Sequence, residues 1–140
     1  MNIKVKKLNK YARINKPAHI GDAGFDVFST ERIVLNPGQR YAMPLGIAIQ
    51  MPYDMVCLVE QKSGLAKKYG IDTIGNVIDA SYRGEIHAII VNTGLEKVII
   101  EDNQKVAQLR FVPVIIPELV FVDELDDSSR GEDGFGSTGL

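Results

Sequence analysis

Residues 75–86 have the sequence Gly-Asn-Val-Ile-Asp-Ala-Ser-Tyr-Arg-Gly-Glu-Ile. The rest of the chain is organised around this stretch. The stretch places a carboxylate, Asp79, and an aromatic side chain, Tyr82, between two β-forming runs at 77–78 and 86–91. Glycine near both ends of the stretch predicts a β-hairpin that turns back on itself. Two interpretations are open: an ordinary surface turn, or the rim of a pocket whose backbone N–H and C=O groups pair with a planar base.

Short apolar runs continue along most of the chain. They predict strands at residues 3–6, 33–35, 41–49, 55–59, 97–100 and 105–116. One helical turn is expected at 61–70, with Ser63 as its N-cap and Gly70 as its end. About ten short strands and a single helix favour an all-β, jelly-roll-like β-sandwich.

Composition and charge narrow the function classes. The chain has 140 residues and a net charge of −2, which gives no overall attraction to nucleic acid or to an anionic membrane. No apolar run approaches the length of a membrane span, and the charged start is not a signal peptide. We therefore expect a cytoplasmic protein with neither nucleic-acid nor membrane partners. The only cysteine, Cys57, falls in an apolar run and is expected in the core, not as a nucleophile.

Three further segments carry groups that suit an anionic ligand. Lys62, Ser63 and Gly64 bring a cation, a hydroxyl and a backbone amide to the start of the expected helix, which is typical of an anion site. Asp26 lies between two apolar residues and is expected to point away from them, although a turn cap is an alternative role. Gln108 is a polar residue in an otherwise apolar strand.

The C-terminal residues are expected to form a flexible, Gly-rich arm at 126–140, beyond a core at 1–125. Four of the ten residues at 130–139 are glycine, which favours flexibility. The same run also carries a guanidinium, a lone phenylalanine and two hydroxyls, which are groups that can close over a base and its phosphates. With no Ser-His or Cys-His pair, the combined features favour phosphoryl transfer to water by Asp79, with Mg²⁺ carried by the substrate's phosphates.

The order of these segments resembles that of the homotrimeric dUTP pyrophosphatases, or dUTPases. Five motifs of that family follow one another over nearly the whole chain, at residues 22–26, 62–66, 75–86, 106–109 and 130–139. The third and fifth motifs are long and specific. The resemblance implies a jelly-roll subunit, a homotrimer with three sites at subunit junctions, and an arm from a neighbouring subunit that closes each site.

The resemblance also implies roles for individual residues in a Mg²⁺-dependent hydrolysis of dUTP to dUMP and pyrophosphate, which keeps uracil out of DNA and supplies dUMP for dTMP synthesis. Asp79 would activate water for attack at the α-phosphorus, and Tyr82 would stack under the deoxyribose and exclude a 2'-hydroxyl. The uracil edge would pair with the backbone around Asn76, Val77, Ile78 and His87. Phosphates would be held by Lys62, Ser63, Gly64 and Gln108, with Asp26 in support. The arm would supply Arg130, Phe135, Gly136, Ser137 and Thr138.

Several departures from the family pattern, at Lys62, Asn76, Ser81 and Asp133, and three alternative functions stand beside this interpretation. Lys62 occupies a position where the family usually has arginine, so a forked contact becomes a point contact, and Asn76 replaces a usual glycine. A dCTP deaminase shares a similar hairpin, but it would need an acid near Ile89, where this chain has none. A dUTP-binding regulator without activity and a structural β-sandwich module are the non-enzymatic alternatives.

Overall fold

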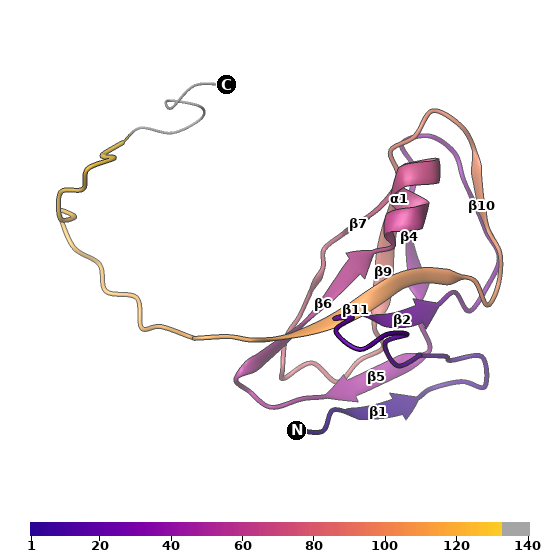
Figure 1. Ribbon diagram of the computed structural model, residues 1–140, viewed down its shortest axis with the longest axis horizontal. Coiled ribbons are helices and arrows are strands. Elements are labelled where there is room, and N and C mark those ends of the chain that lie inside the picture. The colour runs from indigo at the N-terminus through magenta and orange to yellow at the C-terminus, as the bar shows by residue number, and fades with distance from the viewer. Residues whose placement is uncertain (133–140) are drawn as a thin grey trace.

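The computed structural model describes residues 1–132, which form an antiparallel β-sandwich with one short helix (Figure 1). The elements in chain order are β1 (Lys4–Lys7), β2 (Phe25–Phe28), β3 (Ile33–Leu35), β4 (Arg40–Pro44), β5 (Ile47–Gln50), β6 (Met55–Gln61), α1 (Ser63–Tyr69), β7 (Ile71–Ile74), β8 (Val77–Ile78), β9 (His87–Asn92), β10 (Val98–Ile100) and β11 (Lys105–Pro113). The predicted all-β class with a single helix is confirmed.

The strands form four small antiparallel sheets. The largest has the order β2-β11-β6-β8, and a second has the order β4-β9-β7. Two pairs, β1-β5 and β10-β3, complete the described part of the chain. Neighbours in these sheets are mostly distant in sequence, as is common where jelly-roll connections cross between layers.

The core lies between the sheets and follows the two-residue period of the strands. In β6 the buried residues Met55, Cys57 and Val59 alternate with partly exposed ones, and in β9 Ala88 and Ile90 do the same. Burial in this apolar layer raises the pKa of the Cys57 thiol to about 12. The prediction that Cys57 is a core residue is therefore confirmed.

The hairpin predicted for residues 75–86 is wrong in its pairing. Strand β8 pairs with β6, where Ile78 lies opposite Cys57, whereas β9 pairs with β4 and β7. Gly75, at a φ of 63°, turns the chain out of β7 and into the other sheet. The stretch is thus a corner between two sheets, because the residue pattern marks each strand but not the strand that pairs with it.

The helix begins at Ser63, so its N-cap lies one residue before the predicted cap. Lys62 is the N-cap and makes no side-chain cap hydrogen bond, so the expectation that Ser63 caps the helix is wrong. Gly70 ends the helix as expected, in a left-handed conformation with a φ of 69° that glycine adopts without strain. Asn76 has no positive φ, since Asn103 is the one non-glycine residue with that property among residues 1–132. Gly75 takes the left-handed position instead.

After β11 the chain leaves the sandwich. The amide of Val114 donates to the Asp54 carbonyl at 2.9 Å, and residues 115–132 then run outward with exposed side chains (Figure 1). The division into a core at 1–125 and an arm at 126–140 stays a prediction. Phe135, Gly136, Ser137 and Thr138 lie outside the described residues. Within residues 1–132, no helix is both long and apolar enough to cross a membrane.

Candidate active site

A pocket of about 210 Å³ opens at the corner between the two sheets. Its walls come from β8, the turn that follows it, and β9. The lining residues are Gly75, Val77, Ile78, Asp79, Tyr82, Glu85, His87 and Ile89. Five of them, Val77, Ile78, Asp79, Tyr82 and His87, are residues that were predicted for the base, the deoxyribose and the catalytic carboxylate. The pocket interpretation of the 75–86 stretch is thus the one that the geometry favours.

Tyr82 is held at this pocket by its own turn. Its amide donates to the Asp79 carbonyl at 3.0 Å, and its hydroxyl donates to the Glu85 carbonyl, also at 3.0 Å. The ring passes so close to Gly84 that a Cβ there would lie 2.3 Å from the tyrosine hydroxyl. The absence of a side chain at Gly84 therefore makes room for the ring of Tyr82.

Glu85 orients two residues of the pocket, although the sequence did not single it out. Its carbonyl oxygen lies 3.1 Å from His87 Nδ1 as well as accepting from Tyr82. A carbonyl can only accept, so the contact with His87 requires a proton on Nδ1 and leaves Nε2 as the acceptor of the neutral ring. The Glu85 carboxylate in turn accepts from the amide of Gly46 at 2.8 Å.

A sequence signal did exist for two of the three lining residues that were missed, Glu85 and Ile89. Glu85, His87 and Ile89 are alternate residues around the start of β9, and alternate residues of an extended chain share one face. Placing His87 in the site should therefore have brought Glu85 and Ile89 with it.

Asp79 is exposed at the rim of the pocket, where water can reach its carboxylate. It also borders a second hollow of about 340 Å³, which is mainly apolar. The other residues around that hollow are Tyr53, Met55, Val56, Ala80, Ser81, Val114 and Ile116. Asp79 thus lies between two open spaces.

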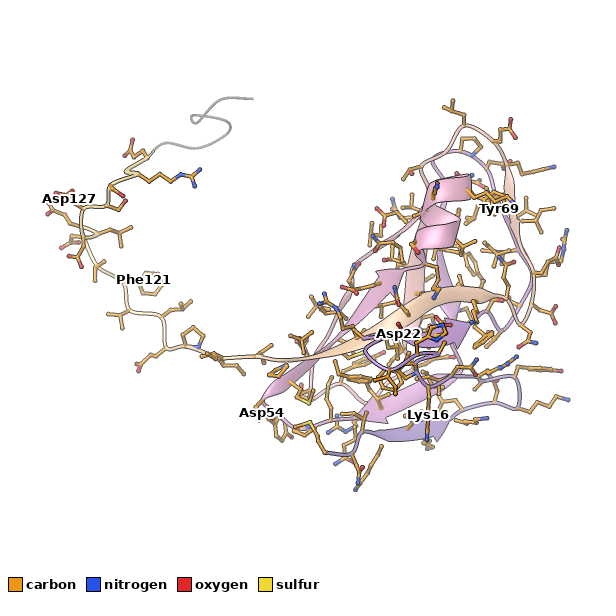
Figure 2. The ribbon with its side chains drawn as sticks, in the orientation of Figure 1. Lys16, Asp22, Asp54, Tyr69, Phe121 and Asp127 are labelled. Atoms are coloured by element: carbon orange, nitrogen blue, oxygen red, sulfur yellow. The ribbon has the colours of Figure 1, made fainter. Side chains whose placement is uncertain are left out.

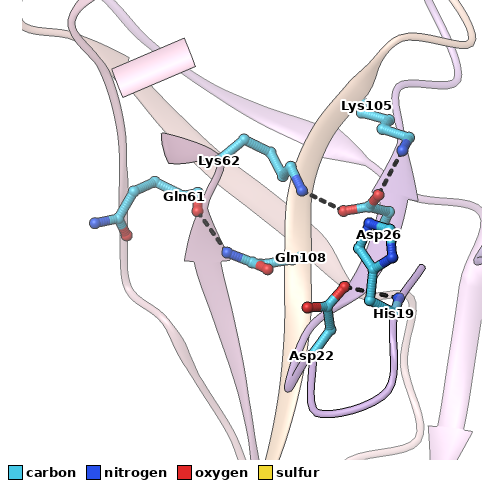
Figure 3. A network of polar contacts seen from close by, with 7 residues as sticks. All are labelled: His19, Asp22, Asp26, Gln61, Lys62, Lys105 and Gln108. Carbon is cyan, nitrogen blue, oxygen red and sulfur yellow. Dashed lines mark hydrogen bonds and ion pairs between the residues drawn. The ribbon is translucent and has the colours of Figure 1, made fainter. Parts of the chain in front are cut away.

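A second group of predicted residues gathers on the sheet formed by β2, β11 and β6 (Figure 3). Asp26 on β2 contacts the ammonium of Lys62 through Oδ1, and Lys105 Nζ lies 2.7 Å from its Oδ2. Burial disfavours the charge on Asp26, but the hydrogen bonds and positive charges of Lys105 and Lys62 outweigh it and hold the pKa of this carboxyl below its ordinary value. Lys105 was not predicted from the sequence.

Gln108 belongs to the same group, because it lies directly opposite Asp26 in the pairing of β11 with β2. Its amide nitrogen donates to the Gln61 carbonyl at 3.0 Å (Figure 3). A Cβ on Gly24 would lie only 2.0 Å from Gln108 Oε1, so this glycine makes the room for the amide. Gln61 directly precedes Lys62, which places Gln108 close to the start of α1.

The start of α1 adds exposed polar groups to the second group. Ser63 and Gly64 follow Lys62 and are exposed, and the amides of a helix's first turn have no carbonyl partner within the helix. Asp26, Lys62, Ser63, Gly64 and Gln108 are therefore brought to one region.

The two groups do not share a residue. No member of the Asp26 group lines the Tyr82 pocket within residues 1–132. Asn76 is not among the lining residues of that pocket either, and its carbonyl accepts from the amide of Val59 at 2.9 Å. The C-terminal segment that carries Asp127 runs outward from the sandwich (Figure 2), and Arg130 follows Asp127 in that segment.

A jelly-roll-like sandwich with a small pocket on one side and a lysine-rich group on another is suited to a phosphorylated ligand with a planar end, and these features indicate a nucleotide-binding β protein. A family model described as dUTPase matches residues 10–139. The chain belongs to the dUTPase family.

Relatives with the name deoxyuridine 5'-triphosphate nucleotidohydrolase match the chain over its length. The protein of Clostridium novyi (strain NT) is 43% identical and covers 100% of both chains. That of Paramecium bursaria Chlorella virus 1 is 41% identical over 97% of this chain and 96% of its own.

Solved structures agree with the fold. The dUTPase of Staphylococcus bacteriophage 80alpha with dUpNHpp has a TM-score of 0.92 at 32% identity and covers 99% of both chains. A variant dUTPase of phage phi11, described with a structural Mg(II) ion, has a TM-score of 0.84 at 27% identity and covers 91% of this chain and 100% of its own.

Proposed function

We propose that this protein hydrolyses dUTP to dUMP and pyrophosphate. The observation that carries the proposal is the turn in which the Tyr82 amide binds the Asp79 carbonyl, because it places an aromatic ring and an accessible carboxylate at one small pocket. Membership of the dUTPase family supports the same reaction. Hydrolysis would keep uracil out of DNA and supply dUMP for dTMP synthesis, and the proposed place of action is the cytoplasm, where dUTP is a precursor nucleotide.

The pocket gives the proposed basis of substrate selection. Val77 and Ile78 of β8 and His87 of β9 line the pocket. Together with the backbone of Asn76, these residues would pair with the edge of uracil and reject bases that add an amino group or a methyl group. Tyr82, fixed by its hydrogen bond to the Glu85 carbonyl, would stack under the deoxyribose and leave no space for a 2'-hydroxyl.

Asp79 is the proposed general base. Its exposed carboxylate would take a proton from water as the water attacks the α-phosphorus, and the bond between that phosphorus and the bridging oxygen would break to release pyrophosphate. This role needs a carboxylate in reach of water, and the exposed position of Asp79 at the rim of the pocket supports it. Deamination of dCTP is not supported, since the residue that the deaminase would need as an acid is Ile89.

The second group is the proposed phosphate site. Lys62 would supply a positive charge, Ser63 and Gly64 a hydroxyl and amides, and Gln108 an amide donor or acceptor. Asp26 would support the group by holding Lys62 in place, which the contact between the two side chains favours.

Mg²⁺ is the proposed cofactor, carried by the phosphates of the substrate. No side chain is proposed as a direct ligand: Mg²⁺ keeps several waters and is commonly bound through substrate phosphates, and among residues 1–132 no cluster of three or more His, Cys, Asp or Glu side chains could hold it. When bound, the ion would neutralise negative charge on the phosphates.

A homotrimer is the proposed assembly. The pocket and the phosphate group do not share residues within one subunit, so a site that joins them across a subunit boundary would use both. The outward course of residues 115–132 lets a C-terminal arm reach a neighbour (Figure 1). In that arm Arg130, Gly136, Ser137 and Thr138 would close over the phosphates, and Phe135 would stack on uracil. Nucleic acid and membrane are not proposed partners.

The test is an assay of the full-length protein with Mg²⁺ and, separately, dUTP, dCTP, dTTP and UTP. We expect dUMP and pyrophosphate from dUTP alone. Asp79→Asn should lower kcat by about a hundredfold to ten-thousandfold, because a neutral amide cannot take the proton of water. Ser81→Ala, two residues away on the same turn, is the matched control and should keep most of the activity.

Two outcomes of this assay would contradict the proposal and favour another function. Binding of dUTP without turnover would favour the regulator, and release of ammonia from dCTP would favour the deaminase.

A further inference from the structure

One half-buried carboxylate in the phosphate group is shared by two ammonium groups. The Asp26 side chain is only 15% exposed, and each of its oxygens has its own lysine: Lys62 contacts Oδ1, and Lys105 lies 2.7 Å from Oδ2 (Figure 3). A guanidinium can bind both oxygens of a carboxylate at once, whereas an ammonium makes a point contact. In this chain two separate residues therefore occupy the two oxygens.

The two lysines differ in their surroundings. Lys62 directly precedes Ser63 and Gly64, so it lies beside the proposed phosphate site, and its side chain is 26% exposed. Lys105 begins β11 and is 50% exposed, on the side of Asp26 away from Gln108 (Figure 3). Only Lys62 is thus adjacent to all the groups proposed to bind phosphate.

The Lys62 ammonium has three N–H donors and can contact Asp26 and a phosphate at once, but a carboxylate beside it offsets the positive charge that the phosphate meets. The carboxylate of Asp26 is charged at neutral pH, because the two lysines keep its pKa below the ordinary value. A half-buried charge left without a partner is unfavourable, so Asp26 alone would compete with the phosphate for the Lys62 ammonium. A second cation on Asp26 removes much of that competition.

We propose that Lys105 is a positioning residue for the hydrolysis of dUTP: by neutralising Asp26, it leaves the Lys62 ammonium available to the phosphates of the substrate. This inference rests on the proposed function, because it assumes that Lys62 binds the phosphates of the substrate. Lys105 itself touches Asp26 and acts on the substrate only through Lys62.

The test is the Lys105→Gln variant. With one cation removed, Asp26 holds Lys62 more strongly, and we expect the KM for dUTP to rise about tenfold, the change that one hydrogen bond to a charged group commonly makes. We expect kcat and its pH profile to stay near those of the wild type, because Asp79 is unaffected. Lys105→Arg keeps the positive charge and should restore the wild-type KM.

A matched pair of controls separates this role from a general effect of charge. Lys97→Gln removes an exposed lysine from the loop before β10 and should leave KM unchanged. In an Asp26→Asn background, Lys105→Gln should add little to KM, because the competing carboxylate is gone. An equal effect of Lys105→Gln with and without Asp26 would overturn the inference, and so would a fall in kcat with KM unchanged.

Binding of inorganic pyrophosphate, measured by calorimetry, tests the same inference without turnover. We expect Lys105→Gln to weaken pyrophosphate binding by about the same factor as it raises KM. If the wild type binds pyrophosphate but does not hydrolyse dUTP, the proposed function fails while the inference about Lys105 is still decided by the variant. Unchanged pyrophosphate binding in Lys105→Gln, or no binding by the wild type, overturns it.

Discussion

The hydroxyl of Tyr82 donates a hydrogen bond to the carbonyl oxygen of Glu85 at 3.0 Å. The bond passes over Gly84, where a Cβ would lie 2.3 Å from the hydroxyl and 2.5 Å from the adjoining ring carbon. The orientation of the ring at the pocket therefore depends on the missing side chain at position 84.

Gly84→Ala should displace the Tyr82 ring and weaken the selection of dUTP over UTP. We expect the ratio of kcat/KM for the two substrates to fall about tenfold or more, since a shift of an ångström at a binding surface has effects of this size or larger. Tyr82→Phe separates the two causes, because it removes the hydrogen bond that fixes the ring but adds no methyl group beneath it, and it should lower the ratio less than Gly84→Ala does. A wild-type ratio in Gly84→Ala would show that the ring can move without consequence.

Gly24→Ala should push the Gln108 amide out of its place. The added methyl would overlap Gln108 Oε1, which lies 2.0 Å from the position of that Cβ, and a flexible side chain yields more readily than the backbone. We expect kcat/KM for dUTP to fall about as far as in Gln108→Ala, by roughly tenfold. Steady-state assays of both variants and of their combination check this. Additive losses in the double variant would contradict a shared cause.

Asp26 should make the stability of the protein depend on pH in the acid range. Its pKa in the folded protein lies below the ordinary value of 3.8, so its contribution is fully present above that value and is lost as the pH falls toward the folded pKa. We expect Asp26→Asn to lower the free energy of unfolding by about 1 to 2 kcal/mol at pH 7, with a smaller difference near pH 3. Urea unfolding at several pH values measures it, and a difference independent of pH would contradict the assignment.

Cys57 should resist thiol reagents while the protein is folded. The side chain is fully buried, and burial raises the pKa of the thiol to about 12, so almost no thiolate is present at pH 8. Labelling, measured by the absorbance of the released chromophore, should be slow in buffer and fast in concentrated urea. Rapid labelling of the native protein would place Cys57 at an accessible surface instead.

Removal of residues 126–140 should leave the sandwich folded but reduce turnover of dUTP. The described part of this segment, residues 126–132, contributes no strand, so circular dichroism should change little. We expect kcat/KM to fall at least tenfold, because the proposed base-stacking and phosphate-binding groups of the arm are lost. Gel filtration of the truncated chain checks that the assembly is kept.

Mixing subunits tests whether the arm acts on a neighbour. The truncated chain keeps Asp79, and a full-length Asp79→Asn chain keeps the arm, so mixed assemblies refolded from both should regain part of the activity that neither has alone. No recovery in the mixed assemblies would indicate that each arm serves its own subunit.

Much of the fold was predictable because it depends on local patterns. The two-residue alternation of buried residues in β6 and β9 marks the strands, and Gly70 marks the end of α1. The cap of α1 was misplaced by one residue because Ser63 is favoured at an N-cap in general, while Lys62 takes that place here without a side-chain hydrogen bond.

The site was predictable to the extent that its residues are close in sequence. Asp79 and Tyr82 share one turn, and Lys62 and Ser63 are adjacent, so their grouping needs no knowledge of the fold. Glu85 was missed because it contacts Tyr82 and His87 through its backbone carbonyl, a group that every residue has. Lys105 was missed because a lysine at the start of a strand is ordinary until its neighbour is known.

By itself, the sequence determined the all-β class, the position of most strands, the burial of Cys57 and the family of the chain. Only the tertiary structure decided that β8 pairs with β6 and not with β9, and that Asp26 meets both Lys62 and Lys105. The physical reason is that periodicity is a property of a few consecutive residues, whereas strand partners are chosen by which arrangement of all the strands buries the apolar faces together.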